Sequence, residues 1–259
     1  MHRVSHDRLC GELLACTAKL AEIVSGDLAC PVPTCPGWTL RQLATHVGRG
    51  HRWAAEIVTT RAAEAIPLRQ VPDGRLPDDP ARHAKWLNAA AAQVVEAVTA
   101  ADGDPVWTFL GMRPASFWAR RRAHEVAVHL ADAQLATGRD VDLPADLAAD
   151  GIDEWLGILA AGTEGTTDVA WSEDLRGDGQ TLHFHTTDDG LDGTGEWLTR
   201  RTPSGITVEP GHAKADVAVR GPAVSLLLVL TRRLPPSDPA IEILGDRALF
   251  GHWLDHTQF

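Results

Sequence analysis

Residues 120–129 read RRRAHEVAVH and lie in the middle of a predicted helix that runs from about Pro114 to Gly138. At about 100° per residue, Glu125 and His129 are separated by about 40° around the helix and by one turn along it. Both side chains can therefore reach one ion. The spacing differs from the zinc-protease motif H-E-x-x-H, in which the two histidines are four residues apart. It predicts a Glu-x-x-x-His pair of metal ligands.

A pair of side chains cannot close a metal site, so a third donor is expected on another helix. The helix predicted to begin at Thr39 carries His46 in register with Leu43 and Trp53, which places this histidine toward the interior. His51 is displaced from His46 by about 140° and is expected outside. Two imidazoles and one carboxylate with a vacant position suit catalytic zinc, and also iron, nickel or manganese. Spacing alone leaves this triad open, because a helical histidine is usually a surface residue or a hydrogen-bonded core residue.

The first half of the chain has the pattern of a four-helix bundle. Apolar residues recur at helical spacing in four segments, and Thr39 and Gln42 have the spacing of a capping box. The predicted helices span about 5–25, 39 to at least 57, 79–101 and 114–138. Four amphipathic helices of similar length favour a bundle.

The second half has a different pattern, which begins after a linker rich in proline and aspartate at residues 140–146. Beyond Gly162 the apolar period falls to two, which is typical of strands. The predicted elements are a helix at about 148–161, strands around 182–185 and 216–219, a short apolar segment at 241–244, and helices at 222–233 and 247–256. Strands followed by helices predict a smaller α+β domain with a mostly antiparallel sheet. The predicted domains are residues 1–145 and 146–259.

The composition indicates a folded protein with a small-molecule partner. Hydrophobic residues make up 44% and charged residues 23% of the chain, close to the globular average. Lys and Arg number 24 against 35 Asp and Glu, for a formal net charge of −11, which argues against nucleic acid or an anionic membrane as partner. The chain has no apolar run of membrane-spanning length and no secretion signal at its start. We expect a cytoplasmic monomer.

Several further residues of chemical interest have simpler interpretations. The four cysteines all fall within the first 35 residues without a C-x-x-C pair, so they are predicted to be reduced thiols, and Cys35 and Trp38 are expected to be structural. His183 and His185 share one face of a predicted strand, as metal ligands often do. No third donor is evident nearby, so both are expected on the exposed face of the sheet.

Two segments, VPTCPGWTLRQLATHV at 32–47 and RAHEVAVHLADA at 122–133, resemble the mycothiol-dependent maleylpyruvate isomerase family. The segments TLHFHTTD at 181–188 and VRGP at 219–222 resemble the C-terminal domain of that family, so the likeness covers essentially the whole chain. The resemblance implies a DinB-like four-helix bundle with a divalent metal, zinc being favoured, bound by His46, Glu125 and His129. It also implies a smaller C-terminal domain similar to sterol carrier proteins, and mycothiol, the low-molecular-weight thiol of actinobacteria, as cosubstrate.

The chemistry that this resemblance implies is activation of a thiol. A free thiol has a pKa near roughly 8.5, and metal ligation deprotonates it. A thiolate that adds to the cis double bond of maleylpyruvate and is later expelled gives an isomerase, whereas a stable adduct gives an S-transferase, the more general name.

The arginines suggest where the substrate and the thiol bind. Arg121 and Arg122 are predicted to bind a substrate carboxylate, with a solvated helix face as the alternative. Arg232 and Arg233 are predicted to bind polar groups of the thiol. A non-catalytic ligand-binding protein stabilised by metal and a non-haem iron oxygenase remain alternative functions.

Overall fold

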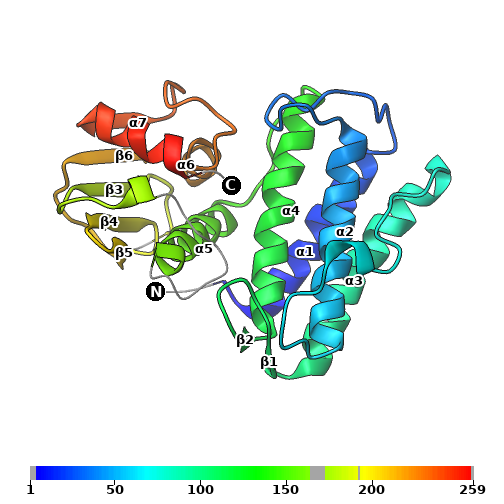
Figure 1. Ribbon diagram of the computed structural model, residues 1–259. Helices are drawn as coiled ribbons and strands as arrows, with labels where there is room; N and C mark the ends of the chain where they lie inside the picture. Colours follow the sequence, from blue (N-terminus) through cyan, green and yellow to red (C-terminus); the bar gives the residue numbers. More distant parts are fainter. Residues whose placement is uncertain (1–3, 164–172, 192, 258–259) are drawn as a thin grey trace. The chain divides into compact units, whose positions relative to one another are not determined.

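The computed structural model describes residues 4–163, 173–191 and 193–257. Within it the chain forms two compact units, one comprising Ser5–Asp142 and the other containing the chain from Leu143 onward. The first unit is helical and the second is α+β (Figure 1). The predicted fold class is therefore confirmed. Within the described residues, no helix is long and apolar enough to cross a membrane.

The first unit is a bundle of four helices. They are α1 (His6–Ile23), α2 (Leu40–Thr59), α3 (His83–Ala101) and α4 (Ser116–Ala136). Both α1 and α2 pack against α3 and α4. Each helix contributes fully buried apolar side chains, among them Leu13, Leu43, Leu87 and Leu130. The observed helices agree with the four predicted segments to within a few residues, apart from a 3₁₀ turn, η2 (Pro80–Arg82), at the predicted start of α3.

The loop before α2 is held in a defined conformation beside that helix. The backbone N–H of Thr39 donates a hydrogen bond to Oε1 of Gln42 at 2.7 Å, as the capping box predicts. Pro31 pairs with Thr39 in an isolated β-bridge, and the N–H of Val32 donates to the carbonyl of Trp38 at 2.9 Å. These bonds close a compact loop that carries Thr34, Cys35 and Trp38.

Short elements connect the remaining helices. One 3₁₀ turn, η1 (Leu68–Gln70), lies between α2 and α3. Strands β1 (Pro105–Val106) and β2 (Arg113–Pro114) form a small antiparallel hairpin between α3 and α4. The hairpin has no alternating apolar pattern, and the sequence did not predict it.

The second unit is a five-stranded sheet with three helices. The strands are β3 (Thr181–Thr186), β4 (Glu196–Thr202), β5 (Gly205–Pro210), β6 (Val217–Gly221) and β7 (Glu242–Gly245). Their order is β5-β4-β3-β6-β7, and all neighbours are antiparallel except β3 and β6. The other elements are the helices α5 (Ala145–Thr163), α6 (Ala223–Leu230) and α7 (Arg247–His256), and a 3₁₀ turn, η3 (Glu173–Leu175).

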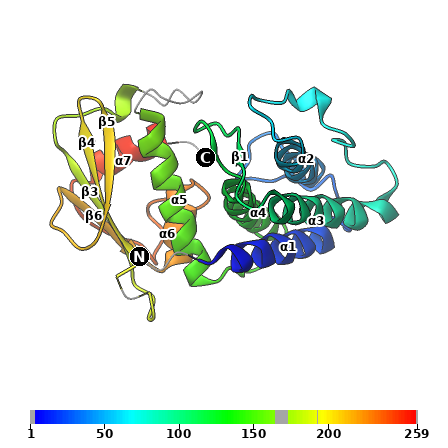
Figure 2. The same ribbon diagram turned by 90° about the horizontal axis from the view of Figure 1, so that it is seen from below.

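The three helices of the second unit lie on one side of the sheet (Figure 2). Phe184 on β3 packs against Phe250 and Trp253 of α7, with ring centroids 6.3 and 5.8 Å away. Trp197 on β4 donates to Asp153 of α5 at 3.3 Å. Because successive strand residues point to opposite faces, His183 and His185 lie on the side away from these helices.

The prediction that both of these histidines are exposed is wrong for His183, which is only 3% exposed. Glu196 and His212 lie against it and cover its ring. The helix predicted to reach Arg233 is also shorter than expected. It ends at Leu230, and Arg232 adopts a positive φ of 65°, which a helix cannot accommodate.

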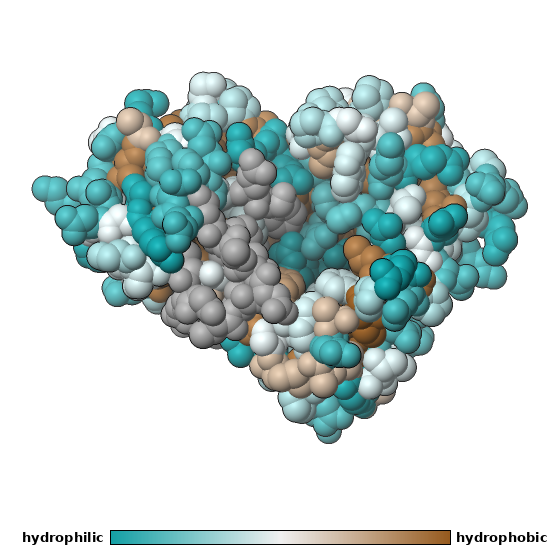
Figure 3. All heavy atoms as spheres, in the orientation of Figure 1, coloured by the Kyte–Doolittle hydropathy of each residue, from teal (hydrophilic) through white to brown (hydrophobic). Residues whose placement is uncertain are grey.

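Polar residues dominate the parts of each unit visible in Figure 3, and hydrophobic residues appear there in small groups. This distribution matches the long series of buried apolar side chains inside the units. The four cysteines all lie among the described residues, and none of them forms a disulfide; Cys10 and Cys16 are buried, whereas Cys30 and Cys35 are half-buried.

The contact between α2 and α3 depends on a glycine. A Cβ atom at Gly48 would lie 2.0 Å from Cζ3 of Trp86. The Trp86 ring is held by a hydrogen bond from its Nε1 to the carbonyl of Asp73 at 3.0 Å and by the guanidinium of Arg52, 4.2 Å from the ring centroid. The indole therefore has little freedom to move aside.

We predict that Gly48→Ala lowers the free energy of unfolding by about 1–3 kcal/mol, because overpacking outweighs the better helix propensity of alanine. Gly11 of α1 is the matched control, since no atom lies within 4 Å of a Cβ placed there. Gly11→Ala is expected to raise that free energy by about 0.5–1 kcal/mol. Urea unfolding of both variants measures the difference, and equal stabilities would contradict this account of the α2–α3 contact.

Candidate metal centre

Three side chains from two helices of the bundle converge on one point. His46 of α2 meets Glu125 and His129 of α4, and one ligand atom from each lies within 4.8 Å of the others. Nε2 of His46 is 3.0 Å from Oε1 of Glu125, and the two imidazole centroids are 5.0 Å apart. Metal–ligand bonds of roughly 2.0–2.1 Å in a tetrahedral site separate ligand atoms by about 3.3 Å. The three donors therefore fit one ion after small side-chain movements.

His129 is oriented by a buried carboxylate. Its Nδ1 lies 2.8 Å from Oδ2 of Asp132, which is fully buried. Asp132 also accepts hydrogen bonds from Oγ1 of Thr34 at 2.6 Å and from Sγ of Cys35 at 3.4 Å. With Nδ1–H directed to Asp132, Nε2 keeps its lone pair for a metal, the usual arrangement of a histidine ligand. Burial lowers the pKa of His129 despite the opposing effect of Asp132, so the ring is neutral, as a ligand must be.

The carboxylate of Glu125 lies between two arginines of its own helix. Nη2 of Arg121 is 2.9 Å from Oε2, and Nη1 of Arg122 is 3.0 Å from Oε1. Burial alone would raise the pKa of Glu125, but Arg122, Arg121 and His46 together hold that pKa well below its ordinary value of 4.5. Both arginines are buried, so the alternative of a solvated helix face is wrong for them. Their contact with a substrate stays a prediction.

His51 is fully buried, which contradicts its predicted position outside the bundle. Its Nδ1 accepts a hydrogen bond from Nε of Arg122 at 3.1 Å, and its Nε2 lies 3.2 Å from Oγ1 of Thr17 on α1. Since Thr17 donates its own proton to the carbonyl of Leu13, it accepts one from His51. The prediction failed because α2 packs against helices on several sides, so its buried face is wider than one narrow apolar stripe. His51 therefore orients Arg122 rather than facing solvent.

Two residues of the loop before α2 lie closer to the centre than predicted. The ring of Trp38 has its centroid 5.1 Å from that of His46 and 6.3 Å from that of His129. Cys35, His129 and Asp132 form a second group with ligand atoms within 4.8 Å.

The sequence showed Asp132 three residues after His129, on the same helix face, and this spacing was the signal that could have identified it.

Arg232 and Arg233 belong to the second unit, just after α6. Nη1 of Arg233 donates to the carbonyl of Thr231 at 2.6 Å, and Nη2 of Arg232 lies 4.0 Å from Oδ1 of Asp255. Both side chains thus have partners in the second unit. Their role in binding a thiol stays a prediction.

The charge arrangement around Glu125 makes a prediction for the metal-free protein. We expect Glu125→Gln to lower the free energy of unfolding at pH 7 by about 3 kcal/mol, because two buried guanidinium groups lose their anionic partner. A depressed folded-state pKa means that this stabilisation is fully present above pH 4.5 and is lost as the pH falls through the folded value. The difference in the free energy of unfolding between wild type and variant should therefore disappear in acid. Unfolding in urea with chelator, at pH 7 and at successively lower pH, measures this difference, and a constant difference would contradict the proposed charge state.

Comparisons with known proteins agree with this architecture. Residues 8–134 match the family described as Mycothiol maleylpyruvate isomerase N-terminal domain, and residues 146–252 match the MDMPI C-terminal domain. An uncharacterized protein of Mycobacterium tuberculosis, Rv0738, is 34% identical over 143 residues, which are 52% of this chain and 69% of the relative.

Solved structures give the same result for the fold. The crystal structure of mycothiol-dependent maleylpyruvate isomerase, and that of a mutant of it, match with a TM-score of 0.59 over 94% of this chain and 95% of theirs. The sequence identity is 17%, so this likeness concerns the fold. Together with the two domain matches, it shows that the chain belongs to the mycothiol maleylpyruvate isomerase family.

Proposed function

We propose that this protein is a metal-dependent enzyme that uses a low-molecular-weight thiol, with mycothiol as the favoured cosubstrate, to modify a small electrophilic metabolite. The observation that supports this proposal best is the convergence of His46, Glu125 and His129. Three protein ligands are the number found in catalytic zinc sites, where the fourth position accepts an exogenous ligand. When bound there, a divalent metal such as zinc supplies the positive charge that keeps a thiol deprotonated at neutral pH.

Neighbouring residues hold the proposed ligands in position. Asp132 fixes the ring of His129, and Arg121 and Arg122 keep Glu125 ionised. Trp38 lies beside both histidines and shields them from solvent on that side. Ligands held in place by neighbouring residues bind and orient a substrate at a smaller entropic cost than mobile ones.

The charges near the centre favour an anionic electrophile. The guanidinium groups of Arg121 and Arg122 both lie against Glu125, beside the proposed metal position. A substrate carboxylate that approaches Arg121 would be attracted and oriented there. This proposal retains the role predicted for Arg121 and Arg122, while Glu125 is their partner in the absence of substrate.

The reaction itself has two forms that share the first step. The thiolate sulfur forms a bond to an electrophilic carbon while another bond of that carbon breaks. In an unsaturated acid the π bond breaks and its electron pair moves onto the neighbouring carbon, in an epoxide the C–O bond opens to an alkoxide that takes up a proton, and in a halide the halide ion departs. If that bond breaks again after rotation about the former double bond, the enzyme is an isomerase, as the solved relative is by its printed name. If the adduct is released, the enzyme is an S-transferase, which we take as the general description because it requires no elimination step.

The ligand assignment predicts that His46→Ala and His129→Ala each lose the metal of the bundle site, together with thiol-dependent turnover. Metal content of untagged protein, measured by mass spectrometry, and turnover with mycothiol test this prediction. Asp132→Asn is expected to weaken metal affinity by roughly 10–100-fold, since it removes the partner of a ligand. His6→Ala is the control, because His6 lies at the exposed start of α1. Full metal content and turnover in His46→Ala would refute the assignment.

A second test identifies the reaction class. Wild-type protein loaded with zinc is incubated with mycothiol and a panel of epoxides, halides and cis-unsaturated acids, and products are separated by mass. A product that carries the thiol, with hydrogen halide lost where the substrate was a halide, indicates a transferase. A substrate of unchanged mass but altered geometry indicates an isomerase. Binding of the same compounds without conversion, equally strong with and without thiol, would favour the ligand-binding alternative. Turnover that consumes oxygen with ferrous iron would favour the oxygenase.

A further inference from the structure

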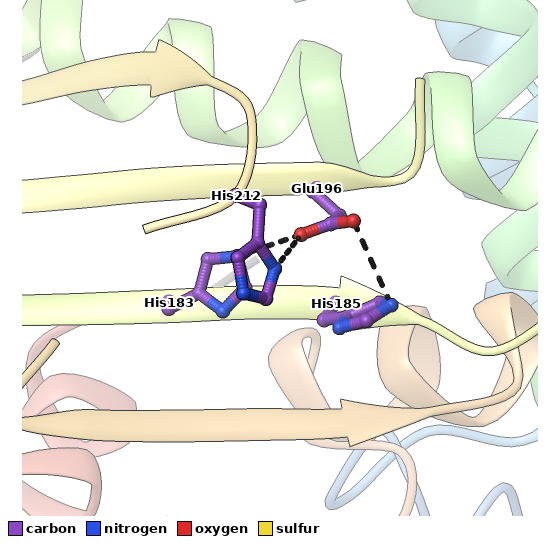
Figure 4. A group of neighbouring side chains, drawn as sticks. All are labelled: His183, His185, Glu196 and His212. Carbon is purple, nitrogen blue, oxygen red and sulfur yellow. Dashed lines mark hydrogen bonds and ion pairs between the residues drawn. The ribbon is translucent and has the colours of Figure 1, made fainter. Parts of the chain in front are cut away.

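A second group of metal-ligating side chains lies in the α+β unit. His183 and His185 come from β3, Glu196 from the start of β4, and His212 from the chain just after β5 (Figure 4). One ligand atom from each of the four lies within 4.8 Å of the others. The proposed catalytic function does not use this cluster.

The strand register brings these four residues together. His185 is the cross-strand partner of Glu196, and His183 stands two residues before His185, so all three share one face of the sheet. The fourth depends on a turn at Gly211, which has a φ of 121° and donates its N–H to the carbonyl of Glu196 at 3.0 Å. This turn directs the chain back over β4, where His212 reaches Glu196.

The four side chains point toward one centre. Oε2 of Glu196 is 3.1 Å from Nε2 of His183 and 2.7 Å from Nδ1 of His212, and Oε1 is 3.7 Å from Nε2 of His185. The three imidazole centroids are separated by 5.1 to 6.0 Å. The three oxygen–nitrogen distances, 2.7 to 3.7 Å, bracket the distance of about 3.3 Å between ligand atoms of a tetrahedral metal.

The charge of the cluster also favours a cation. Three imidazole rings and one carboxylate bring their nitrogen and oxygen lone pairs close together at one point. A divalent ion accepts those lone pairs and compensates the carboxylate charge. Imidazole is a good ligand for zinc, nickel and copper, whereas magnesium and calcium prefer oxygen.

We propose that His183, His185, Glu196 and His212 form a second divalent metal site, with zinc-type chemistry and a structural role. Four protein ligands complete a tetrahedral coordination shell, which is the pattern of structural rather than catalytic zinc. The ion ties β3, β4 and the segment after β5 together. It therefore stabilises the sheet on the face away from the helices.

The test uses untagged, full-length protein freed of metal with chelator and titrated with Zn²⁺ by calorimetry. We expect wild type to bind one equivalent of zinc at this site. His212→Ala is expected to lose that equivalent, because its zinc affinity there falls by more than about 100-fold. The His212 side chain is 75% exposed, so its truncation leaves the core intact. Glu196→Gln is a second variant with the same expected loss. Lys214→Ala, an exposed change in the same segment, is the control and should bind zinc as wild type does.

The outcome at this site is separable from that at the bundle, because His46→Ala removes only the bundle site. The supporting result has two parts: His46→Ala still binds one equivalent of zinc that raises its melting temperature, and His212→Ala lacks this equivalent. The second site is then established even if the proposed function is wrong. If zinc binding to His212→Ala and Glu196→Gln equals that of wild type in number and affinity, the second site does not exist. If Lys214→Ala loses the equivalent as His212→Ala does, the effect is not one of ligation and the proposal fails.

Discussion

The half-buried carboxylate of Glu125 is the charge on which the arrangement of the helical unit depends. An ionised carboxylate inside a protein is costly unless cations and hydrogen bonds compensate it. Here Arg121 and Arg122 supply the cations from the same helix, and His46 supplies a contact from α2. The need to satisfy this one group therefore brings α2 and α4 together at the position where a metal would bind.

The network extends beyond Glu125 and explains several residues that have no direct chemical role. Arg122 also donates to the carbonyl of Val47 at 3.3 Å and to His51, which in turn contacts Thr17 of α1. A Cβ atom at Gly50 would lie 2.7 Å from Nη2 of Arg122, so a larger residue there would require the guanidinium to shift from its present position. Interactions of this kind hold ligands in position because each partner is itself fixed. The stability of the bundle and the geometry of the centre depend on the same contacts.

The sequence predicted the features that depend on local pattern, and it missed those that depend on packing between distant parts of the chain. Helical periodicity, the capping box at Thr39 and the Glu125–His129 spacing all have counterparts in the structure. The burial of His51 and His183 was missed, because it depends on neighbours from other elements. The β4 sequence EWLTRRT is largely polar, so it gave a weak strand signal. Glu196 and His212 join His183 only through strand register, which no short motif encodes.

The two histidine clusters differ in a way that suits different roles. The bundle cluster has three candidate ligands, and the side chain of His46 is 35% exposed, which leaves access for an exogenous ligand. The sheet cluster has four ligands around one carboxylate, and an ion held by all four has no position left for substrate. On the proposed assignments, chemistry belongs to the helical unit and metal-dependent stability to the α+β unit. The ligands of each proposed ion lie entirely within one unit, so the loss of either ion would leave the ligands of the other in place.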